Sequence, residues 1–370
     1  MKSAWLQTDD PRWHAALRGI SHDVYHLPEY CRLAAEDEGG EAVAFWAEDA
    51  GDQLLVPMLE RSLPALVDPG RRYSDGASPY GYPGPVMSDG ADAEAMLQCL
   101  VSSAAERGMV TAFLRLHPLL PCDWLQATDP GQGIRVEHGQ TVSINLKQNE
   151  ADQWSEVRSR IRSQIRRLGR EGFRVHWNDW GRYGEFLSIY EQTMKQVGAS
   201  DRYFFGADYF YGLKAALGDR LHLAVVDAPG PGAEMAAAAI FTEEDGIVQY
   251  HLGGTADHWR SAGPSRLLFD SARRFFGAES GRGNRALHLG GGLGGGEDSL
   301  FRFKAGFSRQ RAGFATLRIV LDADANERLE TTWQKRFAPA TFDDDFFPRY
   351  RQQPTSVSQP GDIDARPVCS

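Results

Sequence analysis

Residues 221–254 read LHLAVVDAPGPGAEMAAAAIFTEEDGIVQYHLGG, and this stretch decides the fold. Three runs of mostly apolar residues, each as long as a typical strand, lie at 221–227, 234–243 and 246–254. Short segments rich in Pro, Gly and acidic residues separate the runs, and such segments are typical of tight turns. We therefore predict an antiparallel meander of three strands.

Elements on either side of the meander extend it into a longer pattern. Before it, we predict a strand at 173–177 and helices at 180–197 and 207–217. After it, we predict a helix at 264–279, a strand at 286–290 and a short helix at 298–305. This element order resembles that of the GNAT acyltransferase fold. The first half repeats the order loosely, with a helix, a hairpin, a helix and a strand at 27–37, 42–61, 91–107 and 110–117.

We therefore expect an α/β (α+β) chain of two tandem GNAT-like domains, each with a mixed, mostly antiparallel sheet flanked by helices. The expected bounds are 1–147 for the first domain and 148–314 for the second. A strand at 315–322 returns to either sheet, within an extension at 315–350. Residues 351–370 are polar and Pro-rich, so we expect a flexible tail.

The bulk composition is that of an ordinary globular protein. The 370 residues are enough for two domains, and no apolar run approaches the roughly 20 residues of a membrane-spanning helix. The N-terminal residues carry acids, Pro and His where a secretory signal would be apolar. Cys31, Cys99, Cys122 and Cys369 are scattered, without the spacing of a zinc site or a disulfide framework. We expect a cytoplasmic protein with no metal and no tightly bound cofactor.

A basic segment stands out against the net charge of −10. Residues 156–174, EVRSRIRSQIRRLGREGFR, carry seven Arg and two Glu, with Val, Ile and Leu at helical spacing. The apolar residues would face the core while the arginines face solvent. Arg162 and Arg166 are candidates for binding phosphate or an RNA backbone, and the alternative is an ordinary solvated helix face.

The loop after the meander has the residues of a phosphate site. Arg260-x-x-Gly263-x-Ser265 precedes a helical pattern, followed at once by Arg266. Backbone N–H groups at the start of a helix suit a phosphate or pyrophosphate, and arginines add charge-assisted hydrogen bonds. The loop is similar to the pyrophosphate loop of GNAT enzymes, and the alternative is a plain turn with a helix cap.

A second loop, at 287–308, reads LHLGGGLGGGEDSLFRFKAGFS and packs six glycines into seven positions. Glycine is costly there unless the backbone approaches something closely or adopts positive φ. Gly291 and Gly292 are therefore candidates for donor binding, with a flexible lid as the competing interpretation. Phe303-Lys304-x-Gly306-Phe307 then sets a cation between aromatic rings, which suits an anionic or carbonyl oxygen beside a stacked base.

Several segments together resemble the Fem-like branch of the GNAT superfamily, over roughly residues 20–322. They are SPYGYPGPV (78–86), RLHPLL (115–120), the basic segment, YHLGGT (250–255) and LGGG…EDSLFRFKAGFS. The resemblance implies two fused domains that move an amino acid from aminoacyl-tRNA to an amine, in a peptidoglycan precursor or a small natural product. It implies that Lys304 stabilises charge at the ester carbonyl and that Phe303 contacts the tRNA acceptor end.

Further candidates have both a functional and a structural interpretation. Tyr250 and His251 are adjacent on a strand, so they point to opposite faces, and His251 is either a base or a structural histidine. The candidates for the acceptor groove are Arg202, Tyr203, Tyr80, Tyr82, Arg115 and His117. Aromatic residues in loops also serve packing.

The favoured mechanism is direct aminolysis of a bound acyl donor, without a covalent enzyme intermediate, because no Cys/His or Ser/His/Asp pattern indicates a nucleophile. Aminoacyl-tRNA is the favoured donor, and acyl-CoA is the alternative indicated by the loop at Arg260. The acceptor is a small-molecule or peptide amine. A third hypothesis is a GNAT-like protein that binds its ligands without catalysis.

Overall fold

The computed structural model describes residues 1–353, except 66, 69, 71, 72, 123, 124, 126–132, 200–202, 233, 339–341 and 344. The chain divides into two compact units. Unit 1 contains Met1–Glu137 and the described residues from Ala315 onward, and unit 2 is His138–Phe314. The predicted tail at 351–370 lies almost entirely outside the described residues.

Unit 2 follows the predicted element order closely. Its elements are β7 (Ile134–Asn145), α4 (Glu150–Glu156), α5 (Ser159–Glu171), β8 (Arg174–Trp177), α6 (Tyr183–Gln196), α7 (Ala207–Leu217), β9 (Leu221–Asp227), β10 (Met235–Glu244), β11 (Ile247–Thr255), α8 (Ser265–Phe275), β12 (Ala286–Gly290) and α9 (Ser299–Lys304). The sheet order is β7-β12-β11-β10-β9-β8. Strands β8 to β11 are antiparallel, so the predicted meander is confirmed.

Two irregularities in this sheet bear on the site. The parallel pairing of β11 with β12 covers only Ile247–Gln249 against Ala286–His288. Between β10 and β11 the register shifts, because Phe241 pairs with Tyr250 and Ile240 pairs with Leu252. His251 is therefore the extra residue of a β-bulge, and such bulges re-aim side chains.

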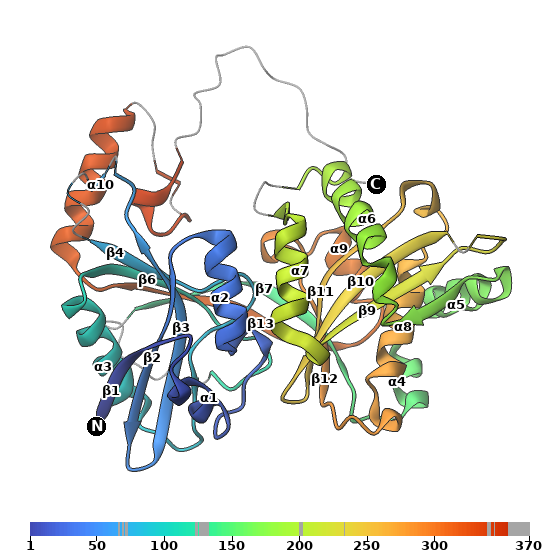
Figure 1. Cartoon of the computed structure of the whole chain (residues 1–370), viewed down its shortest axis with the longest axis horizontal. Helices are drawn as coiled ribbons and strands as arrows, with labels where there is room; N and C mark the ends of the chain where they lie inside the picture. Colours follow the sequence, from blue (N-terminus) through green and yellow to red (C-terminus); the bar gives the residue numbers. More distant parts are fainter. Residues whose placement is uncertain are drawn as a thin grey trace. The chain divides into compact units, whose positions relative to one another are not determined.

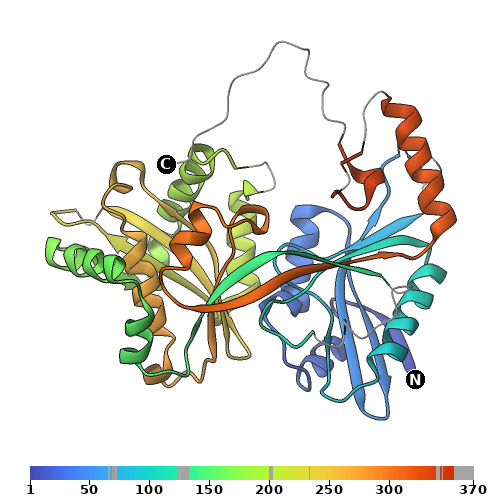
Figure 2. The ribbon, with the colours of Figure 1, turned by 180° about the vertical axis from the view of Figure 1, so that it is seen from behind.

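Helices cover both faces of the unit 2 sheet (Figure 1). Helices α6 and α7 pack on one face, and α8 packs on the other with α5 against it, as the reverse view shows (Figure 2). The apolar stripe of α5 is buried as predicted, with Ile165 and Leu168 in the core that also contains Phe269 and Phe307. Val157, predicted to belong to the same stripe, is buried in this core but lies before the helix begins. The arginines of α5 are therefore left on its outer side.

Unit 1 contains the remaining strands of the sheet, in a mixed arrangement. Its elements are β1 (Lys2–Gln7), α1 (Pro11–Leu17), α2 (Pro28–Glu38), β2 (Glu41–Asp49), β3 (Asp52–Ser62), β4 (Ser74–Ala77), β5 (Val86–Met87), α3 (Ala93–Glu106), β6 (Met109–Arg115), β13 (Gln310–Val320) and α10 (Ala323–Phe337). The strand order is β1-β2-β3-β4-β6-β13, and β5 pairs with β3. Among the described strands of unit 1, only β4 and β6 pair in parallel, so this part of the sheet is mostly antiparallel, as predicted.

The division between the units differs from the expected boundary at 147/148. It falls at 137/138, because the unpredicted strand β7 pairs antiparallel with β12 through Val142–Asn145 and so belongs mainly to unit 2. The predicted returning strand is β13, which begins at Gln310, earlier than expected. Its Thr316–Val320 segment pairs with β6, so the strand returns to the first sheet.

Candidate functional site

Lys304 lies at the end of α9 with its side chain turned inward. Asp298 caps the helix, accepting hydrogen bonds from the Phe301 N–H at 2.8 Å and the Leu293 N–H at 2.9 Å. Lys304 is only 6% exposed, and its Nζ donates to the Gly291 carbonyl at 2.8 Å. The same Nζ lies 5.7 Å from the centre of the Tyr250 ring. Lys304, Tyr250 and Gly291 therefore come together where the β11–β12 pairing has ended.

Burial sets the protonation of both polar side chains here. Desolvation lowers the pKa of Lys304 to about 8, partly opposed by the charge of Asp298. Because this pKa is above 7, the ammonium form of Lys304 still predominates at neutral pH. An ammonium has three hydrogens, so one can remain on Gly291 while others reach a further oxygen. Burial raises the pKa of Tyr250 to about 12, so its hydroxyl keeps its proton.

A chain of aromatic rings leads away from Lys304. The Tyr250 ring meets Phe269 of α8 edge-on at 4.9 Å between centroids, and Phe269 lies 5.5 Å from Phe303. Phe303 is half-buried, whereas Phe307 is 1% exposed and belongs to the core. Gly253 makes room for Tyr250, because a Cβ on that glycine would lie 2.6 Å from the Tyr250 hydroxyl.

The loop predicted to bind pyrophosphate is bonded to itself. Gly263 has a φ of +73°, and an added Cβ would lie 1.6 Å from the Nη1 atom of Arg266, which donates to the Gly263 carbonyl at 3.2 Å. The Ser265 hydroxyl bonds to Thr255 at 2.6 Å. Arg260 is exposed and faces Asp257 at 3.9 Å. Backbone N–H groups of residues 260, 262, 263 and 266 donate to carbonyls of residues 257, 259 and 263.

The basic helix α5 packs against α8 and also contacts this loop. Arg167 donates to the Ala262 carbonyl at 3.2 Å. Burial first, and then the nearby charges of Arg160 and Arg167, lower the pKa of Arg266. The Arg266 guanidinium also lies 5.6 Å from the Phe303 ring. Arg266 therefore joins the aromatic chain in a positively charged environment.

The other predicted donor residues are distributed around α5 and the glycine-rich loop. Arg162 donates to the Trp154 carbonyl at 3.2 Å, and Arg166 lies 5.7 Å from the Trp154 ring. A Cβ at Gly292 would meet Asp298 at 2.4 Å, and one at Gly295 would meet the β7 backbone at 2.5 Å. Close packing against Asp298 and β7 therefore explains these glycines without a ligand.

His251 does not join Lys304. Its Nε2 lies 3.0 Å from the hydroxyl of Tyr209 on α7, on the opposite face of the sheet from α8. It is 6% exposed. The structural interpretation of this histidine fits its position better than the role of a base at the Lys304 site.

The predicted acceptor residues of unit 1 gather at one place, but in different ways. Arg115 donates to the carbonyls of Ser78 and Pro79 at 2.7 and 3.0 Å, so it holds the Pro/Gly loop from behind. His117 is 3% exposed, and its Nε2 lies 2.9 Å from a carboxylate oxygen of the buried Asp23. The Leu119 N–H donates to His117 Nδ1 at 3.1 Å, so Nε2 carries the hydrogen to Asp23.

Tyr80 and Tyr82 are the partly exposed members of that group. The Tyr80 carbonyl accepts from Tyr30, and the Tyr82 ring lies 6.0 Å from His117. In unit 2, the Tyr203 carbonyl accepts from the Tyr190 hydroxyl at 2.7 Å. Arg202 lies outside the described residues.

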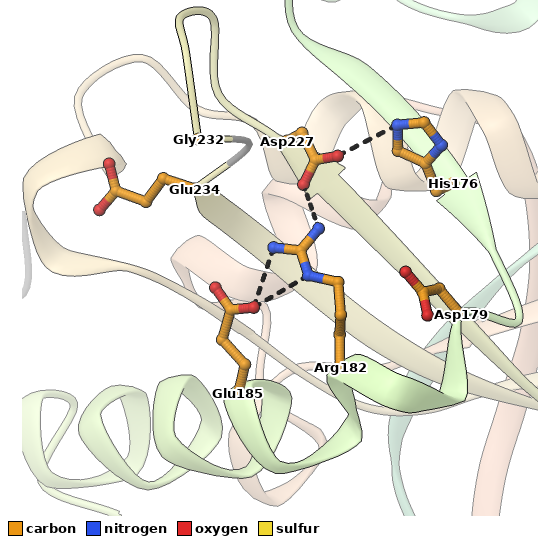
Figure 3. A pocket seen from close by; sticks show the side chains of 7 residues that line it. All are labelled: His176, Asp179, Arg182, Glu185, Asp227, Gly232 and Glu234. Carbon is orange, nitrogen blue, oxygen red and sulfur yellow. Dashed lines mark hydrogen bonds and ion pairs between the residues drawn. The ribbon is translucent and has the colours of Figure 1, made fainter.

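A hollow of about 360 Å³ in unit 2 contains none of the predicted residues (Figure 3). Arg182 is paired there with Asp227 and with Glu185, the latter at 2.9 Å. His176 reaches Asp227 at 3.1 Å, and Glu234 lines the other side. Its central charges are thus paired with one another.

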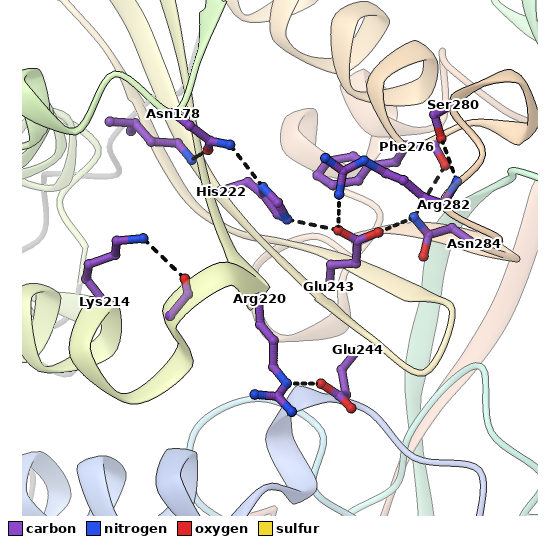
Figure 4. A network of polar contacts seen from close by, with 12 residues as sticks. Asn178, Lys214, Arg220, His222, Glu243, Glu244, Phe276, Ser280, Arg282 and Asn284 are labelled. Carbon is purple, nitrogen blue, oxygen red and sulfur yellow. Dashed lines mark hydrogen bonds and ion pairs between the residues drawn. The ribbon is translucent and has the colours of Figure 1, made fainter.

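A polar network fixes the end of the β9–β10 pair (Figure 4). Glu243 accepts hydrogen bonds from His222 at 2.9 Å, Arg282 at 2.7 Å and Asn284 at 2.6 Å. Burial would raise the pKa of Glu243, but these partners outweigh burial and leave the pKa lowered. The network ties β10 to the loop before β12 and so has a structural role.

Two residues of the Lys304 site were not predicted. Asp298 could have been found, because an acidic residue three positions before Phe301 opens a helical pattern and is a typical N-cap. Phe269 had no such signal, because it sits among the apolar positions of α8 like any core residue.

Among the described residues, no cluster of three His, Cys, Asp or Glu side chains could hold a metal ion. No described helix combines the length and apolar character needed to span a bilayer.

The fold is similar to that of FemX, with 14% sequence identity and a TM-score of 0.65, covering 85% of this chain and 97% of FemX. L-PGS from Bacillus licheniformis is similar at 13% identity and a TM-score of 0.50, covering 88% of this chain and 96% of that one. A conserved protein of unknown function from Bacteroides thetaiotaomicron VPI-5482 matches at 11% identity and 0.52, covering 84% and 97%. No family model and no curated protein matches the sequence. Identities this low show a shared fold alone, and at that level they confirm the predicted Fem-like fold.

Proposed function

We propose that this chain is an N-acyltransferase that moves an aminoacyl group from aminoacyl-tRNA to an amine by direct aminolysis. The observation that carries the proposal is the buried Lys304 ammonium, directed by the Gly291 carbonyl and lying over the Tyr250 ring. A buried cation is costly, and it is most useful where negative charge develops during a reaction. The Fem-like fold supports the same assignment.

In the proposed reaction, the neutral amine nitrogen of the acceptor attacks the ester carbonyl carbon and forms the new N–C bond. The carbonyl oxygen gains negative charge and accepts a hydrogen bond from Lys304. The C–O bond to the ribose then breaks, and the proton lost by the amine ends on the ribose hydroxyl. Since Tyr250 keeps its own proton and His251 lies on the other face, water or the substrate itself carries that proton.

Two observations favour aminoacyl-tRNA over acyl-CoA as the donor. Phe303 offers a half-buried ring beside Lys304 on which a terminal base can stack. The loop that would bind the CoA pyrophosphate already uses backbone N–H groups internally, and Arg266 fills the space over Gly263. That loop is therefore poorly prepared for a diphosphate.

The proposed acceptor is a small-molecule or peptide amine. Tyr80 and Tyr82 are the unit 1 residues best suited to touch it, because both are partly exposed. Arg115 supports their loop from behind through the Ser78 and Pro79 carbonyls, whereas His117 is held by the buried Asp23. We propose that the protein works in the cytoplasm, where charged tRNA is found.

The test is a transfer assay with a radiolabelled aminoacyl-tRNA pool and a panel of amines, with labelled amide as the product. Lys304→Met should lower kcat by about 10² to 10³, as loss of an oxyanion donor does, with little change in the KM for tRNA. Lys214→Met is the matched control, because Lys214 also donates to a carbonyl, that of Gly218 at 3.2 Å, and lies over the Trp180 ring. It should retain activity.

Each other outcome has a definite meaning. Transfer from acyl-CoA but not from tRNA would move the protein to the acyl-CoA N-acyltransferases. Binding of donor with no transfer to any amine in the panel would favour the non-catalytic hypothesis. Equal activity of wild type and Lys304→Met would refute the role of Lys304.

A further inference from the structure

A second pocket lies on the other side of the segment that follows Lys304. It has a volume of about 480 Å³ and is lined by the residues around the start of α5 and the start of β13. Four of the lining residues are arginines, namely Arg158, Arg162, Arg309 and Arg311. Glu156 is the one acidic residue in the lining set.

A single carboxylate offsets only part of the charge of the four arginines. The Glu156 carboxylate accepts from the Ser308 hydroxyl at 3.0 Å and from the backbone N–H of Arg309 at 3.1 Å, and Gln148 lies 3.4 Å from its other oxygen. Its hydrogen-bonding capacity is thus largely used to hold the turn between α9 and β13. The pocket keeps a net positive charge.

The arginines repel one another where they stand. Burial first, and then the charge of Arg158, lower the pKa of Arg311, against a smaller opposing effect of Glu297. Arg311 is held by the Ser308 and Gln310 carbonyls at 2.9 and 2.8 Å, so it cannot simply swing away. A bound anion would relieve this repulsion, and arginine forks match phosphate oxygens.

The pocket is joined to the proposed catalytic lysine by the backbone. Arg158 donates its N–H to the Gly306 carbonyl at 2.8 Å, two residues after Lys304. Gly306 permits this approach, because a Cβ there would lie 2.3 Å from Ile161 of α5. The first turn of α5 adds the positive end of its dipole.

We propose that Arg158, Arg162, Arg309 and Arg311 form a phosphate-binding site for the acyl donor. This inference rests on the proposed function, since it assigns the site to the donor of that reaction. A phosphodiester of the tRNA strand and a phosphate of coenzyme A offer the same chemistry. The two sources are separated by using each as a probe.

The experiment compares binding of an uncharged tRNA pool and of coenzyme A across a salt series. The variants are wild type, the double variant Arg158→Gln and Arg309→Gln, and the control Arg170→Gln. Arg158 and Arg309 are exposed, so their replacement should leave the fold intact, which an unchanged thermal midpoint verifies. Arg170 is exposed at the far end of the same helix.

For tRNA, we expect the double variant to bind about tenfold more weakly and the slope of log K against log salt to fall in magnitude by about 1 to 2. The control should match wild type. A selective loss of coenzyme A binding would identify that phosphate source instead. If the control weakens binding as much as the double variant does, the basic surface is diffuse and the proposed site is overturned. The site is also overturned if the double variant binds both probes as tightly as the wild type, or if the wild type binds neither probe.

Binding of uncharged tRNA or coenzyme A involves no transfer, so the two proposals fail separately. If binding depends on the pocket and no amide forms, the proposed function fails and the phosphate site stands. If amide forms and the double variant binds like wild type, the site fails and the function stands.

Discussion

Replacing Lys304 by methionine should make the protein more stable while removing its proposed activity. Methionine has nearly the length of lysine, so it can fill the same buried space without a charge. The lysine is 6% exposed, and desolvation is the largest cause of its lowered pKa. The charged form therefore costs folding free energy at neutral pH.

The size of this cost follows from the pKa. A decrease from the ordinary 10.5 to about 8 corresponds to about 3 kcal/mol at about 1.4 kcal/mol per pKa unit. The variant loses the hydrogen bond to the Gly291 carbonyl, worth about 1 to 2 kcal/mol. We expect Lys304→Met to be more stable by about 1 to 2 kcal/mol near pH 7.

The pH dependence has a definite sign. The folded pKa is below the unfolded pKa, so the unfolded chain binds more protons between about pH 8 and 10.5 and wild-type stability rises across this window. At about pH 9.5 the cost of the wild-type charge falls to about 1 kcal/mol. The advantage of the variant should then shrink by about 2 kcal/mol.

The assay is urea-dependent hydrogen exchange of peptides from β12 and α9, at about pH 7 and about pH 9.5. These peptides report the free energy of unfolding of unit 2 separately from unit 1. Lys214→Met, on a half-exposed lysine, should show a much smaller change. The reasoning is refuted if Lys304→Met is less stable than wild type near pH 7, or if its difference from wild type does not depend on pH.

Three further predictions concern other parts of unit 2. Gly263→Ala should destabilise the protein more than Gly281→Ala in thermal melts, because both glycines have a φ of +73° but only at Gly263 would the new Cβ meet a guanidinium nitrogen, at 1.6 Å. Equal losses would mean that backbone strain alone matters. Phe303→Ala should weaken tRNA binding by about 1 to 3 kcal/mol in titrations, with a small change in stability. Phe307→Ala should instead lower the free energy of unfolding in urea by about 3 to 5 kcal/mol. The reverse pattern would contradict the stacking role of Phe303. The pKa of Glu243 is lowered from its ordinary 4.5. Its network should therefore stabilise the fold above about pH 4.5 and lose that effect as pH falls through the folded value. A Glu243→Gln protein should show a flatter acid denaturation curve, and an unchanged curve would exclude this contribution.

The parts of the site that could be predicted are those encoded by local sequence. The segment FRFKAGF orders Phe303, Lys304, Gly306 and Phe307 on a single helical turn and the residues after it, so their relative positions follow from the sequence. The burial of Lys304 and its bond to Gly291 depend on tertiary contacts, but the glycine-rich loop next to it pointed to the same region.

The parts that could not be predicted depend on distant pairing. Strand β7 begins with the mostly polar residues 134–140, of which none is fully buried, so it lacks the alternation that marks a half-buried strand. The orientation of Tyr250 and His251 was undecided, because helices cover both faces of the sheet and a β-bulge falls at His251. Likewise, nothing local distinguishes the paired Arg266 from an arginine that is available to a ligand.

The discontinuity of unit 1 has a consequence for synthesis on the ribosome. All of His138–Phe314 is made before Thr316–Val320, the segment of β13 that pairs with β6. A nascent chain can therefore complete the second sheet while the first still presents β6 as an open edge, and open strand edges invite pairing with other chains. The last described strand, β13, covers the β6 edge, so premature termination after residue 314 should yield chains that aggregate through unit 1.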